Sequence, residues 1–380
     1  MDLLKSLDAA LAAQKADAWL VHDFKGSNPV FTEFVGDRCL TRRAVLIAEQ
    51  NRGIRILLHS VDYTKFPEHE KVVYTNRHEF RGELENIYKR SPRVLMEYSK
   101  KSELPGISYL DAGTYEMIED IGFKVESSAD IYQQIFAVWT PEDLTDHLAA
   151  VQAYSAARNV ALKAIGENLG AITEGDVIQL LRKEVARSGM ELMGPSVAAN
   201  ANSRFPHYEP QGGGDLIKRG DWILIDSHCH RPGKVCSDIT WMAYAGEKVP
   251  QDRADVFDAV INARDIAVRL IEESMARGER IEGWQVDKAA RDSIAARGYG
   301  PYFVHRLGHS LGREIHGRGV NMDDFETRDT RALIPSIAFT IEPGIYLPEY
   351  GARSEIDVFI EPNGPRVTTP IQREITLIGN

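Results

Sequence analysis

Cysteine is scarce in this sequence, and its scarcity excludes a fold held together by disulfide bonds. Only Cys39, Cys229 and Cys236 occur among 380 residues, and they form no CxxC pair. Three cysteines are too few for a disulfide framework in a chain of this length. The sequence therefore predicts a protein of a reducing compartment, the cytoplasm.

Long apolar runs and basic clusters are also missing. No apolar stretch approaches the ~18 residues that a membrane span requires, and the N-terminus leads into an amphipathic segment without the pattern of a signal peptide. The 45 basic residues are outnumbered by 56 acidic ones, which gives a formal net charge of -11. Because no Lys/Arg-rich run offsets this balance, we expect neither a nucleic-acid nor a membrane partner.

The remaining composition is that of a globular chain long enough for two domains. Its first third alternates short apolar runs with amphipathic patterns, which is typical of a small α/β layer domain. This part has no glycine-rich phosphate loop and no cluster of metal-ligand residue types. The patterns predict strands at 16–21, 44–48, 54–58, 72–74 and 94–96, and helices at 79–89 and 112–121.

A domain boundary is predicted just before Thr140 and Pro141. Thr140 suits a helix N-cap and Pro141 suits the first helical position. Further helices are predicted from 173 onwards and over 253–276, between hairpin-linked strands, which indicates an α+β domain built on an antiparallel sheet. We therefore predict an N-terminal domain over 1–138 and a second domain over 139–380. The predicted strands of the second domain are 222–227, 235–242, 338–342, 353–360 and 374–378.

Two of the predicted hairpins each carry a pair of carboxylates. In the first, a turn centred on Pro232 would make Asp226 and Asp238 direct cross-strand neighbours. In the second, the same reasoning places Glu342 opposite Glu355. Each pair follows an apolar run that should be buried, and buried carboxylates require a metal or a paired cation.

The segment 305–316 supplies a candidate nitrogen ligand, His309. Its small neighbours Gly308 and Ser310 allow close approach to a site, and His316 follows seven residues later, outside the HExxH spacing of a zinc protease. Four carboxylates and one imidazole balance the charge of two divalent cations. Oxygen-rich ligation favours Mn²⁺ or a related ion, and a pair of ions ~3.5–4 Å apart activates a water for hydrolysis.

At these motifs the sequence resembles the pita-bread metallopeptidase family, whose proline-specific branch includes Xaa-Pro dipeptidase (prolidase) and aminopeptidase P. The resemblance covers roughly 140–380, and the residues before it resemble the N-terminal domain of that branch. It implies an α+β pita-bread catalytic domain with a smaller N-terminal α/β domain of the creatinase/prolidase type. The matching motifs are Asp226 with Ser237-Asp238-Ile239-Thr240, Gly308-His309-Ser310-Leu311-Gly312 with His316, Glu342-Pro343-Gly344-Ile345-Tyr346, Gly351-Ala352-Arg353-Ser354-Glu355, and Asn202-Ser203-Arg204-Phe205-Pro206-His207-Tyr208.

The resemblance also implies a role for each matching residue. Two divalent metal ions per chain are expected, with manganese favoured and cobalt, zinc or iron as alternatives. Glu342 would also act as the general base, while His207 and His316 would bind the substrate and the oxyanion. Arg353 and Tyr346 would orient the ligands. The implied metal ligands are Asp226, Asp238, His309, Glu342 and Glu355.

Some positions depart from the family pattern. Val235 stands where the family often has a tyrosine, and Trp241 stands where an arginine often follows Asp-Ile-Thr. The two aspartates are twelve residues apart where eleven is usual, and the two glutamates are thirteen apart where fourteen is common. Hydrogen bonds from the replaced side chains are lost, which bears on the reaction rate and on metal preference.

The predicted function is a cytoplasmic, homodimeric Xaa-Pro dipeptidase with a dinuclear metal centre. It would hydrolyse the peptide bond before a C-terminal proline by a metal-bridging hydroxide, and its substrate would be a small peptide with proline at the second position. Three hypotheses stay open beside it: an aminopeptidase P that acts on longer Xaa-Pro peptides, a metal-free creatinase-like hydrolase, and an inactive pita-bread module that binds peptides. The complete set of ligands argues against the last two.

Selection of dipeptides requires a group that binds the proline carboxylate, and an arginine suits this task. The candidates in the first domain are Arg38, Arg42 and Arg43. His228 and His230 lie close to the first aspartate in sequence but are not counted among the ligands. At least one of these two histidines is expected to be exposed near the turn.

Overall fold

The structure, a computed structural model, describes residues 3–379 of the chain. It divides into two compact units, Met1–Phe136 and Ala137–Asn380. Within the described residues, no helix combines the length and the apolar character needed to cross a membrane.

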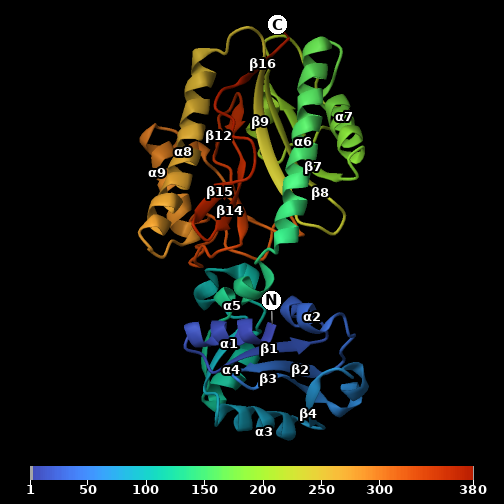
Figure 1. Ribbon diagram of the computed structural model, residues 1–380, viewed down its shortest axis with the longest axis vertical. Coiled ribbons are helices and arrows are strands. Elements are labelled where there is room, and N and C mark those ends of the chain that lie inside the picture. Colours follow the sequence, from blue (N-terminus) through green and yellow to red (C-terminus); the bar gives the residue numbers. More distant parts are fainter. Residues whose placement is uncertain (1–2, 380) are drawn as a thin grey trace. The chain divides into compact units, whose positions relative to one another are not determined.

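The first unit is a six-stranded mixed sheet with helices on both faces (Figure 1). One apolar core lies between the sheet and α1, α2 and α5, and a second lies between the sheet and α3 and α4. The strand order is β4-β3-β2-β1-β5-β6, with β1, β2 and β3 antiparallel and the outer strands joined in parallel. The strands are β1 (Ala18–Phe24), β2 (Arg43–Glu49), β3 (Gly53–His59), β4 (Glu70–Tyr74), β5 (Arg93–Met96) and β6 (Lys124–Ser127), and the helices are α1 (Leu3–Ala13), α2 (Pro29–Val35), α3 (Arg77–Tyr88), α4 (Ala112–Ile121) and α5 (Ala129–Phe136).

A buried carboxyl group, that of Glu97, ties the elements of the first unit together. It accepts hydrogen bonds from Trp19 Nε1 (2.7 Å), Asn28 Nδ2 (2.9 Å) and Ser128 Oγ (3.0 Å). Burial raises the pKa of Glu97 to about 7, although the three donors favour the ionised form.

The raised pKa predicts a pH dependence of the stability of this unit. Between the unfolded pKa near 4.5 and the folded value of about 7, the folded state binds the proton more tightly, so the free energy of unfolding falls as the pH rises. The fall should amount to roughly 3 kcal/mol. In Glu97→Gln the group cannot ionise, and calorimetric unfolding from pH 5 to pH 8 should show a smaller pH dependence. Equal slopes in the two proteins would contradict the assignment.

The second unit places three small sheets between two pairs of helices. Figure 1 shows α6 and α7 on one side of the strands and α8 and α9 on the other. The sheet orders are β16-β9-β8-β7, β10-β11-β14-β15 and β12-β13. The helices are α6 (Pro141–Glu167), α7 (Glu174–Ala186), α8 (Gln251–Ala276) and α9 (Gly283–Ala296), and the strands are β7 (Glu191–Ala199), β8 (Trp222–His230), β9 (Ser237–Ala245), β10 (Ser310–Leu311), β11 (Ala338–Ile341), β12 (Gly344–Tyr346), β13 (Gly351–Arg353), β14 (Ile356–Glu361), β15 (Gly364–Val367) and β16 (Thr376–Ile378).

Local sequence explains where the first helix of this unit begins. Thr140 is the N-cap of α6, Pro141 occupies the first turn, and Thr140 and Asp143 form a reciprocal capping box. This arrangement satisfies backbone N–H groups that have no partner inside the helix. The predicted start of the helix is confirmed, and Thr173 caps α7 in the same way.

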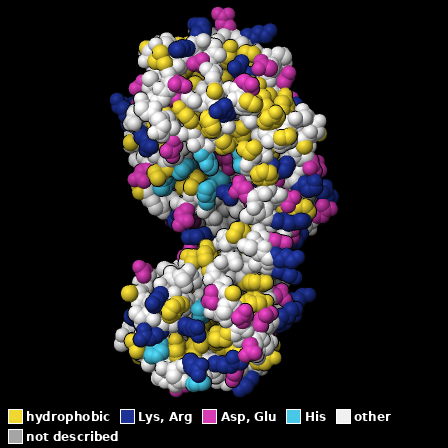
Figure 2. Space-filling model, turned by 180° about the vertical axis from the view of Figure 1, so that it is seen from behind, with side chains coloured by type: hydrophobic (Ala, Val, Ile, Leu, Met, Phe, Trp, Pro, Cys, Tyr) yellow, Lys and Arg dark blue, Asp and Glu magenta, His cyan; other side chains and the backbone are white. Residues whose placement is uncertain are grey.

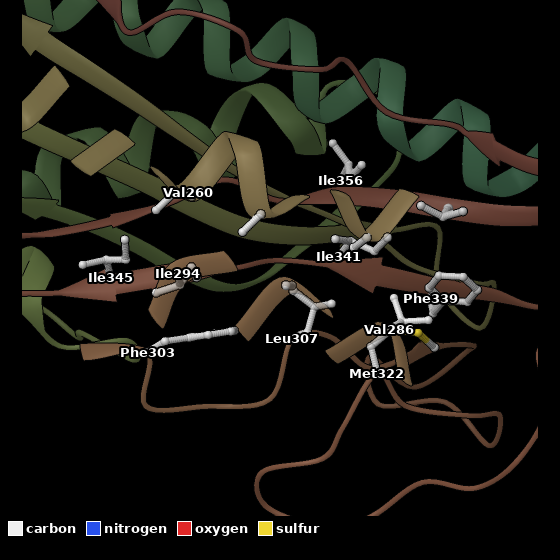
Figure 3. Close-up of a cluster of buried hydrophobic side chains, with 14 of the residues drawn as sticks. Val260, Val286, Ile294, Phe303, Leu307, Met322, Phe339, Ile341, Ile345 and Ile356 are labelled. Atoms are coloured by element: carbon white, nitrogen blue, oxygen red, sulfur yellow. The ribbon is translucent and has the colours of Figure 1, made fainter. Parts of the chain in front are cut away.

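Two apolar cores hold the strands in place. One lies between α6, α7 and the sheet that contains β8 and β9. The other packs α8 and α9 against β11, β12 and β14, and Figure 3 shows its centre. Side chains drawn there that are fully buried include Val260, Val286, Ile294, Leu307, Phe339, Ile341 and Ile345. The strands that carry the acidic residues are therefore fixed from both sides.

The register of the first hairpin differs from the prediction. Asp226 pairs with Thr240, and Asp238 pairs with His228, so the two aspartates are diagonal neighbours on one face instead of direct partners. Pro232 and the following glycine, with a φ of 72°, occupy the two central positions of a turn closed by a hydrogen bond between residues 234 and 231. The ladder is centred on Gly233, so the predicted centre at Pro232 was wrong by one residue.

The second hairpin has the predicted register. Ile341 pairs with Ile356 on one side, and Gly344 pairs with Arg353 on the other. Glu342 and Glu355 lie between these two ladders, opposite one another in the same register. The expected antiparallel sheet is wrong at one edge, because β16 pairs with β9 in parallel.

Candidate metal centre

A cavity of about 460 Å³ opens in the second unit, and all five predicted ligands line it. Five of the eleven histidines of the chain also line it, and Figure 2 shows histidine side chains gathered on one face of this unit. The predicted ligands in the wall are Asp226, Asp238, His309, Glu342 and Glu355, and the other predicted site residues in the wall are His207, His316 and Arg353.

The predicted ligands come from strands or strand ends. Asp226 lies on β8 and Asp238 on β9, so their side chains share a face because they are diagonal neighbours in the ladder. His309 directly precedes β10, Glu342 directly follows β11, and Glu355 directly precedes β14. Rigid strands therefore position the ligands, while His207 and His316 lie on loops.

Three of the ligands come close enough to hold one ion. One ligand atom each from Asp238, His309 and Glu355 lies within 4.8 Å of the others. His309 Nε2 is 3.6 Å from Asp238 Oδ2 and 3.5 Å from Glu342 Oε1. The imidazole thus lies between two carboxylates, so the three groups can bind the same metal ion.

Asp226 is turned toward a different group. Its Oδ2 forms an ion pair with Arg353 Nη2 at 2.5 Å, and its Oδ1 is 2.8 Å from Thr240 Oγ1. The same hydroxyl is 2.8 Å from Glu355 Oε2 and accepts a hydrogen bond from Arg353 Nε (2.8 Å). Thr240 therefore connects the two carboxylates that lie on either side of it.

Tyr346 does not line the cavity but supports the arginine that does. Arg353 Nη1 donates to Tyr346 Oη (3.1 Å), which lies 2.9 Å from His305 Nε2. The other ring nitrogen of His305 is 2.7 Å from the carbonyl oxygen of Arg306. Because a carbonyl only accepts, Nδ1 carries the proton and Nε2 accepts from the tyrosine. Burial and the Arg353 charge lower the pKa of His305 to about 3, so the ring is neutral.

Two cavity histidines, His305 and His228, were not predicted as site residues. His305 lies four residues before His309, and sequence alone does not show that it turns toward Tyr346. His228 lies two residues after Asp226 on the same strand, and the period of two places both on one face. A Cβ at Gly194 would lie 2.8 Å from His228 Cε1, so the glycine leaves space for the ring. The expectation that His228 or His230 is exposed was wrong, because both are half-buried.

Among the described residues, the cavity contains too little positive charge to neutralise its acidic side chains. Burial raises the pKa of Asp226 and Glu342 and, most strongly, that of Glu355, and Arg353 is the guanidinium that opposes these shifts. Clustered carboxylates of this kind are stabilised by a bound cation. Oxygen donors with one imidazole suit Mn²⁺ and related divalent ions, so the donor set fits a metal centre.

The two replaced family positions are filled in different ways. Val235 is buried in an apolar cluster. Trp241 donates from Nε1 to Thr376 Oγ1 (2.8 Å), and the guanidinium of Arg158, from α6, lies 3.7 Å from its ring centre. A cation therefore lies beside position 241 although the residue there is a tryptophan.

Comparison with known proteins agrees with this geometry. The sequence model that describes metallopeptidase family M24 matches residues 147–362 of the chain, more than half of its length. The chain belongs to metallopeptidase family M24. The predicted family, its pita-bread fold and its class of enzyme, a metallopeptidase, are thus confirmed.

Individual relatives are similar to the chain over different lengths. An uncharacterised peptidase of Bacillus subtilis is 35% identical over 184 residues, and the match covers only 48% of either chain. A Xaa-Pro dipeptidase of Pyrococcus furiosus is 29% identical over 295 residues, 74% of this chain and 78% of that protein. Among solved structures, dipeptidase PepE of Mycobacterium ulcerans is similar with a TM-score of 0.70 and 20% identity, over 99% of this chain and 97% of that one. This last likeness shows that the fold is shared.

The contacts of Thr240 predict an effect on metal affinity. Thr240→Val removes the hydroxyl that holds Asp226 and Glu355 without changing the volume of the side chain. Loss of such a supporting contact typically weakens metal binding 10- to 100-fold, which Mn²⁺ titration of the chelator-treated protein would measure. Thr145→Val is the matched control, because among residues 3–379 this exposed hydroxyl bonds only to the Pro141 carbonyl of its own helix. Equal Mn²⁺ affinity in both variants would contradict the assigned role.

Proposed function

We propose that this chain is a Xaa-Pro dipeptidase (prolidase) that releases a C-terminal proline from dipeptides with the help of two divalent metal ions. The observation that carries the proposal is the cavity itself, which brings five potential ligands, four further histidines and a fixed arginine together in one unit. A volume of about 460 Å³ suits a small ligand. The likeness to a Xaa-Pro dipeptidase over 74% of the chain supports the same substrate class.

The proposed roles follow from position and chemistry. The bound metal ions would polarise the scissile carbonyl and lower the pKa of a water. Burial raises the pKa of Glu342, which makes its carboxylate a better proton acceptor near neutral pH. His207 and His316 reach the cavity from two loops, where their N–H groups can stabilise negative charge on the carbonyl oxygen.

The proposed ligand arrangement assigns Asp226 to one ion and His309 with Glu342 to the other. Asp238 and Glu355 would bridge both ions. Manganese as the native metal, a homodimer and a cytoplasmic location complete the proposal. The expectation that Arg38, Arg42 or Arg43 binds the substrate stays a prediction; Arg38 already pairs with Glu68 in the first unit.

Hydrolysis of a small peptide panel tests the proposed specificity. Chelator-treated protein should be inactive, and added Mn²⁺ should restore cleavage of Ala-Pro but not of Ala-Ala. Faster cleavage of Ala-Pro-Ala than of Ala-Pro would instead show an aminopeptidase P. No cleavage of any peptide with Mn²⁺, Co²⁺, Zn²⁺ or Fe²⁺ would reject the peptidase and favour an inactive binding module.

Replacement of the proposed base tests the mechanism. Glu342→Gln removes a proton acceptor and a metal ligand, so kcat for Ala-Pro should fall by at least about 100-fold. The matched control is Glu349→Gln, since Glu349 is an exposed residue in the turn of the same hairpin. A Glu342→Gln enzyme with kcat near that of the control would remove Glu342 from the mechanism.

A further inference from the structure

A histidine that is not among the five predicted ligands lies in the part of the cavity wall that β8 and β9 form. His228 lines the cavity from β8, and among residues 3–379 neither nitrogen of its ring makes a hydrogen bond. The residue is half-buried, so water reaches the ring only in part. An imidazole in this situation has both of its nitrogens available to a ligand inside the cavity.

The strand ladder places this imidazole beside two of the predicted ligands. His228 lies two residues after Asp226 on β8, and the period of two puts both side chains on one face. It is also the direct cross-strand partner of Asp238 on β9, and such partners have Cβ atoms about 4.5–5.5 Å apart. Burial lowers the pKa of His228, and the nearby charges of Asp238 and Asp226 oppose that shift. Two carboxylates and one imidazole therefore share one face of the hairpin.

An irregularity in the neighbouring strand leaves room for the ring. Gly194 and Pro195 of β7 oppose the single residue Ser227 of β8, which makes a β-bulge. Gly194 has a φ of 54°, in the left-handed region that favours glycine. A Cβ at this position would lie 2.8 Å from Cε1, 3.2 Å from Nδ1 and 4.0 Å from Nε2 of His228, so a larger residue would displace the ring. Bulges often direct a side chain beside a functional site, and this one keeps space for His228.

The proposed centre has one ion with fewer protein ligands than the other. The ion beside His309 is assigned His309, Glu342 and the two bridging carboxylates. The ion beside Asp226 is assigned only Asp226 and the same two bridging carboxylates. A neutral imidazole would give the second ion as many protein ligands as the first. It would also leave the balance of four carboxylates against two divalent cations unchanged.

We propose that His228 binds the metal ion beside Asp226 as a sixth protein ligand of the centre. This inference rests on the dinuclear centre of the proposed function, and it is independent of which peptide is cleaved. Imidazole nitrogen suits zinc and iron, whereas carboxylate oxygen suits manganese. His228 therefore widens the choice of ion at this position toward zinc and iron.

The competing explanation is that His228 binds the peptide instead of the ion. A ring nitrogen in the cavity can donate a hydrogen bond to a bound substrate. In that case, removal of the ring raises KM for Ala-Pro and leaves the metal affinity as it was. If His228 is a ligand, the metal affinity falls even when no peptide is present.

Zn²⁺ titration of the chelator-treated protein without peptide separates the two roles. His228→Leu removes both ring nitrogens, and the affinity for one of the two ions should fall by at least about 10- to 100-fold, the loss caused by removal of a group that only supports a ligand. His230→Leu is the matched control, because His230 lies on the same face of β8 but does not line the cavity in the described part of the chain. Unchanged Zn²⁺ affinity in His228→Leu, or an equal fall in His230→Leu, would overturn the inference.

Exchange of the donor atom gives a readout that a purely structural role would not change. His228→Asp replaces a nitrogen donor with an oxygen donor. It should bind Mn²⁺ more tightly than His228→Leu does, and its ratio of Zn²⁺ affinity to Mn²⁺ affinity should lie below that of wild type. Equal ratios in wild type and His228→Asp would contradict direct ligation.

Proton NMR of the Co²⁺-loaded protein counts the bound imidazoles. A histidine that binds Co²⁺ through one ring nitrogen carries an exchangeable proton on the other, and the paramagnetic ion shifts the signal of that proton far outside the usual range. Wild type and His230→Leu should give two such signals, from His228 and His309, and His228→Leu should give one. Two signals from His228→Leu, or one from wild type, would count against the sixth ligand.

The same proteins distinguish this inference from the proposed function. Suppose that His228→Leu loses Zn²⁺ affinity and one imidazole signal, and that wild type cleaves no peptide. That result would support the sixth ligand and reject the peptidase. Metal affinity and imidazole signals that do not depend on His228, in a wild type that cleaves Ala-Pro, would reject the ligand and leave the peptidase standing.

Discussion

The concentration of carboxylates in one cavity is the constraint on which the rest of the second unit depends. Asp226, Asp238, Glu342 and Glu355 lie together in its wall, and burial raises the pKa of Asp226, Glu342 and Glu355 because it makes their ionised forms costly. One fixed guanidinium, that of Arg353, offsets only part of this charge. The site is therefore built for cations, and membership of a metallopeptidase family agrees with that chemistry.

The carboxylates of this site repel one another, and the packing of the surrounding strands opposes that repulsion. Two apolar cores clamp the sheets from opposite sides, so the carboxylates cannot separate without loss of buried apolar surface. Thr240, Tyr346 and His305 hold Arg353 and the carboxylates in one hydrogen-bonded chain. The packing of the sheets thus keeps this hydrogen-bonded chain in place at the centre.

Much of this arrangement could be predicted from short-range sequence patterns. Apolar runs that end in Asp226 or Glu342 showed which strands carry acidic groups, and the cap at Thr140 showed where α6 begins. Strand β7 was not predicted, because Gly194 and the following proline interrupt its pattern and the register shifts there.

Other features could not be predicted because they depend on contacts between distant parts of the sequence. The pairing of Asp226 with Thr240 requires a ladder centred on Gly233, and the sequence does not show which turn residue forms that centre. The stacking of Arg158 on Trp241 joins a helix to a strand eighty-three positions later.

The most direct test of the account is a crystal structure of the Mn²⁺-loaded protein with anomalous scattering recorded at the manganese edge. Two peaks are expected in the cavity, one beside Asp226 and one beside His309 and Glu342, with Asp238 and Glu355 between them. A cavity without a manganese peak, or a single ion held without Asp226, would contradict the dinuclear centre.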